Sequence, residues 1–156
     1  MARLGGGSWN GNVMSAFSAK RRILSLWLPR LPIDRIRRAR ARESGEQVSD
    51  EIPSVVVAKE NNALVIYSLD EAAAGYGLVV GQPLANARAI CPHLQVFDAN
   101  PAADAKTLDD IADWCDRFTP LVALDRPHGL FLDITGCAHL FGGEAALMQI
   151  LCGALA

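Results

Sequence analysis

Long apolar segments are missing from this sequence. No continuous apolar run reaches the ~18 residues that a membrane-spanning helix requires, and the first residues lack the apolar core of a secretory signal peptide. They are instead rich in Gly, Ser and Asn, which is typical of a disordered segment. We therefore expect a cytoplasmic protein with a disordered leader over residues 1–20. With 51% hydrophobic residues, the remainder is expected to form a packed core.

Paired cysteines are also missing. None of the four cysteines belongs to the CxxC pair that is typical of structural zinc sites. Cys91 and Cys137 each precede a histidine by two residues, but Cys-x-His is not the usual spacing of zinc ligands. Cys115 and Cys152 fall at apolar positions of predicted helices. We predict buried free thiols rather than a metal site.

Acidic residues are nearly absent from the first 42 residues, which contain ten Arg and Lys and a single acid, Asp34. The rest of the chain shows the reverse, with five basic and sixteen acidic residues. The predicted helix after Pro32 has a thin apolar stripe, and its basic residues crowd the other face: Arg35, Arg37, Arg38, Arg40 and Arg42. Like charges one turn apart destabilise a helix by about 0.2–0.5 kcal/mol per pair. The pattern leaves two interpretations, a solvated helix face or contact with phosphates or an acidic partner.

The apolar pattern predicts a chain of alternating short elements. Short apolar runs bounded by turn residues are typical of strands, and they occur at residues 22–28, 54–58, 63–68 and 94–97. Apolar residues at i, i+3 and i+4 are typical of helices, and they occur after Pro32 and at residues 69–76, 84–90, 102–118 and 143–156. The order of these elements predicts an α+β fold.

Two carboxylates interrupt the apolar stretch between residues 121 and 143. Asp125 ends one predicted strand and Asp133 ends the next, and together these strands form a hairpin that should pack beside the first strand. A carboxylate is costly to bury unless it is paired, hydrogen-bonded or bound to a metal. The spacing alone leaves two interpretations, in which these residues cap turns or belong to a metal-binding site.

Several short motifs follow one another in a defined order along the chain. They are Ser68-Leu69-Asp70-Glu71-Ala72-Ala73-Ala74, Gly77-Leu78, Gly81-Gln82-Pro83-Leu84, Ala87-Arg88, Cys91-Pro92, Leu124-Asp125-Arg126 and Leu132-Asp133-Ile134-Thr135-Gly136. This order resembles the fingers and palm hairpin of Y-family (UmuC/DinB-type) DNA polymerases. A closer resemblance, to the polymerase-like ImuB branch of that family, is carried by Trp27-Leu28-Pro29, Leu31-Pro32, Asp34-Arg35 and the run from Leu132 to Glu144.

The resemblance implies a particular domain organisation. Residues 21–42 and 93–156 would form part of a ferredoxin-like polymerase palm. Residues 43–92 would form a small fingers subdomain, inserted after the first strand and helix. The thumb and little finger of the family have no counterpart in this sequence, so we expect a fragment of a longer gene, with an exposed apolar surface on its last helix.

The residues that carry the family's chemistry differ here. Active members have an Asp-x-Asp in the first strand, where this chain has no acid, and two-metal nucleotidyl transfer needs several carboxylates. Asp125 matches a family metal ligand, but the following Glu is replaced by Arg126, which we expect to pair with Asp125. The family's triphosphate-binding Tyr and Arg fall near Glu71 and Ala74. We therefore predict an inactive chain with no catalytic residue, metal or cofactor, in which Asp125 is a vestigial metal position and Asp133 a structural cap.

Three functions remain open. The first is a non-catalytic module in bacterial DNA repair and SOS translesion synthesis that contacts DNA or an acidic partner through Arg35, Arg37, Arg38 and Arg40. By resemblance, its partners would include a sliding clamp, a RecA-like accessory protein and an error-prone C-family polymerase. The second is an active Mg-dependent nucleotidyltransferase with relocated carboxylates at Asp34, Asp125 and Glu144. The third is a small α+β interaction domain unrelated to DNA.

Overall fold

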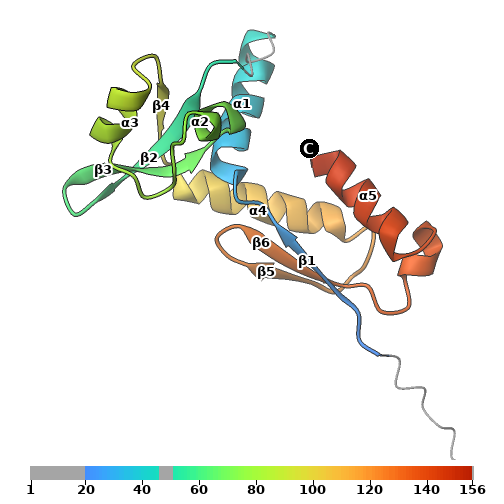
Figure 1. Ribbon diagram of the computed structural model, residues 1–156. Helices are drawn as coiled ribbons and strands as arrows, with labels where there is room; N and C mark the ends of the chain where they lie inside the picture. Colours follow the sequence, from blue (N-terminus) through green and yellow to red (C-terminus); the bar gives the residue numbers. More distant parts are fainter. Residues whose placement is uncertain (1–19, 46–50, 156) are drawn as a thin grey trace, which may run out of the picture.

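The computed structural model describes residues 20–45 and 51–155. In these ranges the chain forms two three-stranded sheets. The helix α4 (Pro101–Cys115) lies between them, and α1 (Leu31–Ser44) runs alongside the second sheet (Figure 1). The predicted leader lies outside the described residues, apart from Lys20. In the described part of the chain, no helix is both long enough and apolar enough to cross a membrane.

The first sheet contains the predicted hairpin. It consists of β1 (Ile23–Trp27), β5 (Val122–Asp125) and β6 (Gly129–Asp133), in the antiparallel order β1-β6-β5. The hairpin therefore lies beside the first strand, as the sequence predicts. Because side chains alternate between the two faces of a strand, one face of this sheet carries the fully buried Leu130 and Leu132, and the other face is open.

Helices cover the buried face of the first sheet. Leu31 of α1, Leu108 of α4 and Leu151 of α5 (Glu144–Leu155) form one core with Leu130. The short helix η1 (Ala138–Phe141) leads from β6 into α5. Burial of each such leucine contributes about 1.5–3 kcal/mol, so these contacts hold the three helices against the sheet.

The second sheet has the order β3-β2-β4, with β2 (Ser54–Glu60) antiparallel to β3 (Ala63–Leu69) and parallel to β4 (Gln95–Asp98). The helices α2 (Glu71–Gly75) and α3 (Leu84–Ile90) pack on it, as Figure 1 shows. Its central apolar run, Val55 to Val57, is buried, which is typical of a strand covered on both faces.

The β2–β3 turn follows from its sequence. Asn61 and Asn62 have φ angles of 46° and 64°. This left-handed conformation suits a two-residue hairpin turn, and asparagine tolerates it better than most residues.

Some boundaries differ from the prediction. β4 begins and ends one residue later than the strand predicted at residues 94–97, and its pairing with β2 extends the second sheet to Asp98. α4 ends at Cys115 rather than at Phe118, because Phe118 donates its N–H to the Cys115 carbonyl in a turn and packs into the core.

The prediction of buried cysteines is correct for Cys91 and Cys115 but wrong for Cys152, which is exposed on α5, while Cys137 is half-buried. The reason is that α5 buries a single stripe through Leu147 and Leu151. Its other apolar residues, Met148 and Ile150 among them, face outward, as expected for the last helix.

Candidate nucleic-acid interface

Asp125, the predicted vestigial metal position, lies at the exposed end of β5. In the register of the first sheet it pairs with Gly129, and Gly129 pairs with Trp27. Gly129 leaves no room for a side chain here, because a Cβ atom would lie 2.9 Å from the Asp125 carbonyl oxygen. This row of the sheet therefore holds one carboxylate, and its residues do not fit a site for two divalent ions.

Asp133 has a different role at the other end of the hairpin. Its Oδ1 accepts the Thr135 N–H at 3.0 Å and its Oδ2 accepts Nε of Arg21 at 2.9 Å. Hydrogen bonds from the Thr135 hydroxyl and N–H, followed by the one from Arg21, lower the pKa of Asp133. The prediction of a structural cap is confirmed by these bonds.

The expected pairing of Arg126 with Asp125 is wrong. A terminal nitrogen of Arg126 instead donates to Asp109 of α4 at 2.6 Å. Consecutive residues at the end of a strand point in opposite directions, so Arg126 reaches the helix while Asp125 stays at the sheet edge. The carboxylate of Asp125 is therefore not paired with the guanidinium of Arg126.

The arginines of α1 divide between the inside and the outside of the molecule. Nε of Arg35 donates to Asp104 of α4 at 2.6 Å, and Arg37 donates to Asp70 at 3.3 Å. Both aspartates are buried, and Asp70 also caps α2 by accepting the Ala73 N–H. The anions opposite these two arginines are thus supplied by the chain itself, from two different elements.

Sequence reasoning missed Asp104. Asp104 is nearly fully buried, and its second oxygen, Oδ2, is unpaired among the described residues. A signal was available, because Asp104 precedes Leu108, Ile111 and Cys115 by four, seven and eleven residues and so falls on the apolar stripe of the helix. A carboxylate in such a stripe predicts a buried cationic partner.

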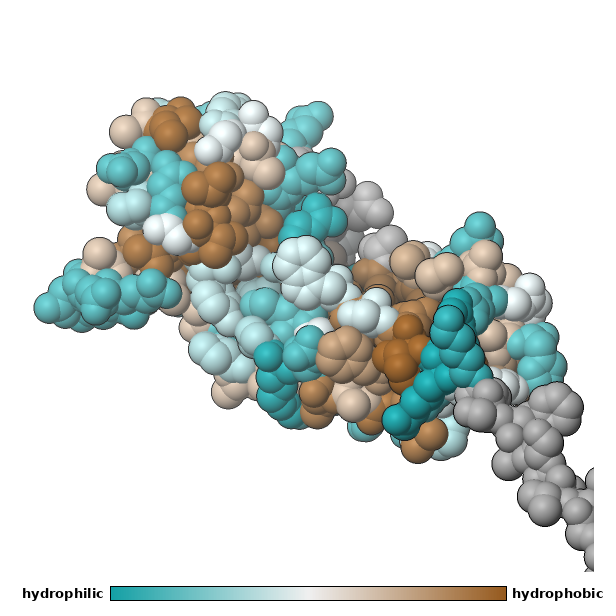
Figure 2. All heavy atoms as spheres, turned by 60° about the horizontal axis from the view of Figure 1, so that its bottom comes forward, coloured by the Kyte–Doolittle hydropathy of each residue, from teal (hydrophilic) through white to brown (hydrophobic). Residues whose placement is uncertain are grey.

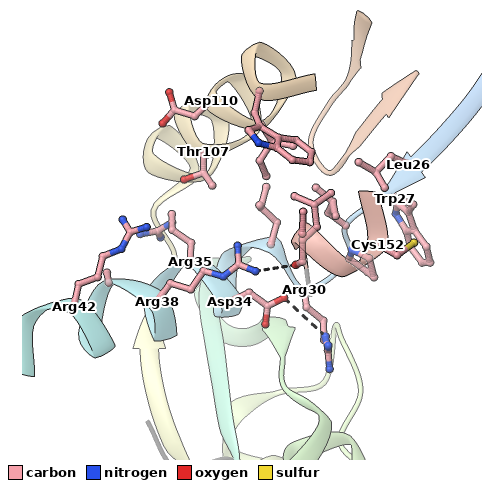
Figure 3. A pocket seen from close by; sticks show the side chains of 18 residues that line it. Leu26, Trp27, Arg30, Asp34, Arg35, Arg38, Arg42, Thr107, Asp110 and Cys152 are labelled. Atoms are coloured by element: carbon pink, nitrogen blue, oxygen red, sulfur yellow. Dashed lines mark hydrogen bonds and ion pairs between the residues drawn. The ribbon is translucent and has the colours of Figure 1, made fainter. Parts of the chain in front are cut away.

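One face of α1, which carries Arg35 as well as Arg38 and Arg42, lines a pocket of about 680 Å³ between α1, α4 and the end of α5 (Figure 3). Arg38 lies here and donates to the Leu155 carbonyl at 2.8 Å, and Arg42 lines the same pocket. Burial raises the pKa of Asp34, against the opposing effect of the nearby arginines, Arg30 first. Arg40 is exposed and stacks over the Phe97 ring at 4.3 Å.

The carboxylates of the alternative active site do not come together. Asp34 lies on α1 beside Arg30, and Glu144 at the start of α5 accepts two bonds from Arg22, at 2.7 and 2.6 Å. In the described ranges, no three His, Cys, Asp or Glu side chains form a group that could hold a metal ion. The residues present therefore do not fit the relocated magnesium site.

Residues 41–156 match the impB/mucB/samB family, over well more than half of the chain. The chain belongs to this family. It is the family of Y-family DNA polymerase domains, so the resemblance predicted from the motifs is confirmed. The chain is also similar to Protein ImuB from two strains of Caulobacter vibrioides, each 52% identical over 80 residues that cover 51% of this chain and 18% of the relative.

Solved Y-family polymerases have the same fold. An insertion ternary complex and a post-insertion binary complex of Dbh DNA polymerase match with TM-scores of 0.65 and 0.66, over 85% of this chain and 37% and 36% of theirs. DinB from Sulfolobus solfataricus matches with a TM-score of 0.62. Sequence identities of 12–13% show the fold alone. The predicted fold, a partial ferredoxin-like palm with an inserted fingers subdomain, is confirmed.

The chain spans little more than a third of these Y-family polymerases. The assignment of the first sheet to the palm and of the second sheet to the fingers stays a prediction. The predicted roles of Asp125 and of the α1 arginines stay predictions, as does the domain boundary near residue 92.

Proposed function

We propose that this chain is a non-catalytic Y-family module in bacterial DNA repair, which serves as a scaffold for DNA and protein partners in SOS translesion synthesis. The row formed by Trp27, Gly129 and Asp125 carries the proposal. Nucleotidyl transfer requires carboxylates that bridge two divalent ions. A row with one carboxylate, an indole and a glycine cannot balance the positive charge of two divalent ions.

The fingers side supports the same proposal. Glu71, near the position where the family binds the triphosphate, is almost fully exposed at the start of α2, and its partner is Arg30 at 3.4 Å. A carboxylate repels phosphates at close range. Nucleotide binding would have to displace this pair and leave the carboxylate facing the triphosphate.

DNA binding is the positive part of the proposal. Arg38, Arg40 and Arg42 are exposed on α1, where the chain has three cations within five residues. Cations of this kind contact phosphates without reading sequence, and their contribution falls as salt rises. Arg35 and Arg37, which the sequence also suggested for this role, hold Asp104 and Asp70 and would support the interface from inside.

Protein partners belong to the wider proposal. By family resemblance they are a sliding clamp, a RecA-like accessory protein and an error-prone C-family polymerase, in the cytoplasm. The matched region covers 18% of the ImuB relatives and 36–37% of the solved polymerases. We therefore propose these partners for the full-length protein and assign none of them to a surface of this chain.

Primer extension tests the proposal directly. The 156-residue chain is incubated with primed DNA, all four nucleotides and either Mg²⁺ or Mn²⁺, beside an active Y-family polymerase. We expect no extension by the chain. Extension that Asp125→Asn abolishes would refute the non-catalytic role.

A binding assay on the same primed DNA separates the scaffold from an interaction domain unrelated to DNA. We expect binding at low salt that weakens steeply as salt rises. Absence of binding at low salt would remove DNA from the proposal.

A further inference from the structure

The open face of the first sheet carries exposed aromatic and aliphatic side chains. We define it by the outward residues of its three strands: Ile23, Ser25, Trp27, Leu121, Ala123, Asp125, Phe131 and Asp133. Trp27 is 73% exposed and Phe131 is 40% exposed. Figure 2, which brings the bottom of Figure 1 forward, shows hydrophobic residues gathered on the lobe that holds this sheet, with hydrophilic residues beside them.

We propose that the open face binds unpaired DNA bases, which stack on Trp27 and Phe131. This inference rests on the proposed DNA-binding function and specifies the part of DNA that the sheet receives. The site would be a stacking platform, with no metal ion and no reaction.

The register places the two rings as neighbours. Trp27 pairs with Gly129, and Phe131 lies two residues further along β6, so the rings are diagonal neighbours on adjacent strands. Such neighbours are about 7–8 Å apart, within mutual reach of aromatic side chains. Successive bases of a single strand stack on neighbouring aromatic rings of this kind.

Small residues leave the rings accessible. Gly129 has no side chain beside Trp27, and the neighbours of Phe131 across the sheet are Ser25 and Ala123. A flat base can therefore approach either ring from solvent. An aliphatic surface without such gaps would suit a protein partner better.

The size of the face also favours bases over a protein. A fully exposed aromatic side chain offers about 150–250 Å², and both rings here are partly covered. Together with Ile23 and Leu121, the apolar residues of the face offer on the order of 500 Å², below the ~800 Å² that each partner contributes to a stable protein interface.

Charges at the two ends give the face a direction. Arg21 lies at the start of β1, is well exposed and bonds only at the surface with Asp133. The bond to Asp133 uses Nε of Arg21, and a guanidinium has five N–H donors, so Arg21 can also donate to a phosphate. Asp125 at the opposite end repels phosphates. The sugar–phosphate backbone is therefore expected near Arg21, with the bases toward Trp27.

Fluorescence anisotropy of labelled oligothymidine measures this binding on the whole chain, with a duplex of equal length for comparison. A stacked base contributes about 1–3 kcal/mol, so Trp27→Ala and Phe131→Ala should each weaken single-strand binding at least about fivefold. Duplex binding, which relies on phosphate contacts, should change less than twofold. Trp27→Phe keeps a ring and should retain most of the affinity.

Two further variants serve as controls. Trp27→Leu keeps an apolar side chain without a ring, and we expect it to lose as much affinity as Trp27→Ala. Val80→Ala removes exposed apolar area from the other lobe and should bind as the unaltered chain does. Unchanged melting temperatures exclude misfolding, because Trp27 is largely exposed.

The outcomes separate this inference from the proposed function. The platform is refuted if Trp27→Leu binds oligothymidine as tightly as the unaltered chain. It is also refuted if both alanine variants bind as tightly while charge reversal at Arg38 and Arg40 weakens binding. In either case the DNA-binding scaffold stands. If Trp27→Ala changes only the self-association of the chain, the face is a protein interface and the inference is also refuted. If the unaltered chain binds neither DNA, both proposals fail.

Discussion

Two ion pairs on α4 have the same length in different surroundings. Asp104 and Asp109 each accept a 2.6 Å bond from an arginine, Arg35 of α1 and Arg126 of the hairpin turn. The Arg35–Asp104 side chains are 19% and 4% exposed, whereas those of Arg126–Asp109 are 48% and 47% exposed. The donor–acceptor distance therefore does not indicate which pair contributes more to stability. Burial does, because breaking a buried pair leaves a desolvated charge and costs far more than breaking a surface pair.

The same contrast divides the arginines of α1. Arg35 and Arg37 bind the buried aspartates Asp104 and Asp70 and so join α1 to α4 and to the start of α2. The side chains of Arg38 and Arg40 are exposed. A run of arginines on one helix can thus contain both structural residues with buried partners and exposed residues. The four predictions that follow test this contrast between buried and exposed charges, from the largest expected effect to the smallest.

Removal of Arg35 should have the largest effect. Arg35→Met leaves the carboxylate of Asp104 buried without a cation, and breaking a buried pair in this way costs about 3–5 kcal/mol. For a chain of this size, each kcal/mol lowers the melting temperature by roughly 2–4 °C. We expect thermal unfolding, followed by circular dichroism, to shift down by about 10 °C.

The matched control removes both charges. Arg35→Met combined with Asp104→Leu replaces the pair by apolar side chains, which is often nearly neutral, so most of the lost stability should return. A single Arg35→Met variant with an unchanged melting temperature would contradict the buried role of this pair.

Charge reversal at the exposed arginines of α1 should weaken DNA binding rather than lower the stability of the chain. Arg38→Glu with Arg40→Glu removes two proposed phosphate contacts and should lower duplex affinity about tenfold or more at low salt. The slope of log affinity against log salt should decrease by about 2. Arg88→Glu on α3 is the control, and an equal loss there would point to net charge rather than to this surface.

The Asp133 cap should make stability depend on pH. The pKa of Asp133 is lowered in the folded chain. Its contribution to stability is therefore present above the ordinary aspartate pKa near 4. That contribution is lost as the pH falls through the lower folded pKa. Asp133→Ala should melt a few degrees below the unaltered chain at pH 7, and the gap should narrow towards pH 2. A gap that widens in acid would contradict the hydrogen-bond assignment.

Removal of Arg126 should have the smallest effect. The Arg126–Asp109 pair is half exposed, and surface pairs contribute about 0–1 kcal/mol. Arg126→Ala should therefore shift the melting temperature by no more than about 3 °C. Asp109→Ala should give a similar value, and a shift as large as that of Arg35→Met would contradict the ranking by burial.

Local signals in the sequence predicted several elements well. α3 begins and ends at the predicted residues, Leu84 and Ile90, because Pro83 opens it and Pro92 follows it closely. The Asn61-Asn62 turn and the two strands of the palm hairpin were equally readable, since turn residues and apolar runs are short-range features. The family motifs added the identity of the palm and fingers.

Side-chain partners were less predictable. The buried position of Asp104, the pairing of Arg126 with Asp109 and the exposure of Cys152 all depend on elements distant in the chain. Sequence spacing indicates which face of a helix a residue occupies but not what lies opposite that face. The predicted interface on α1 treated its four arginines alike, whereas Arg35 and Arg37 hold buried aspartates and the other two are exposed.

By itself, the sequence determined the α+β fold, the family and the absence of an acid from the first strand, because periodicity and motifs are properties of neighbouring residues. Only the tertiary structure decided that Trp27, Gly129 and Asp125 share one row, and that two arginines of α1 face inward while others face outward. Strand register and helix packing bring residues about 100 positions apart into contact, and burial then sets what each charge contributes.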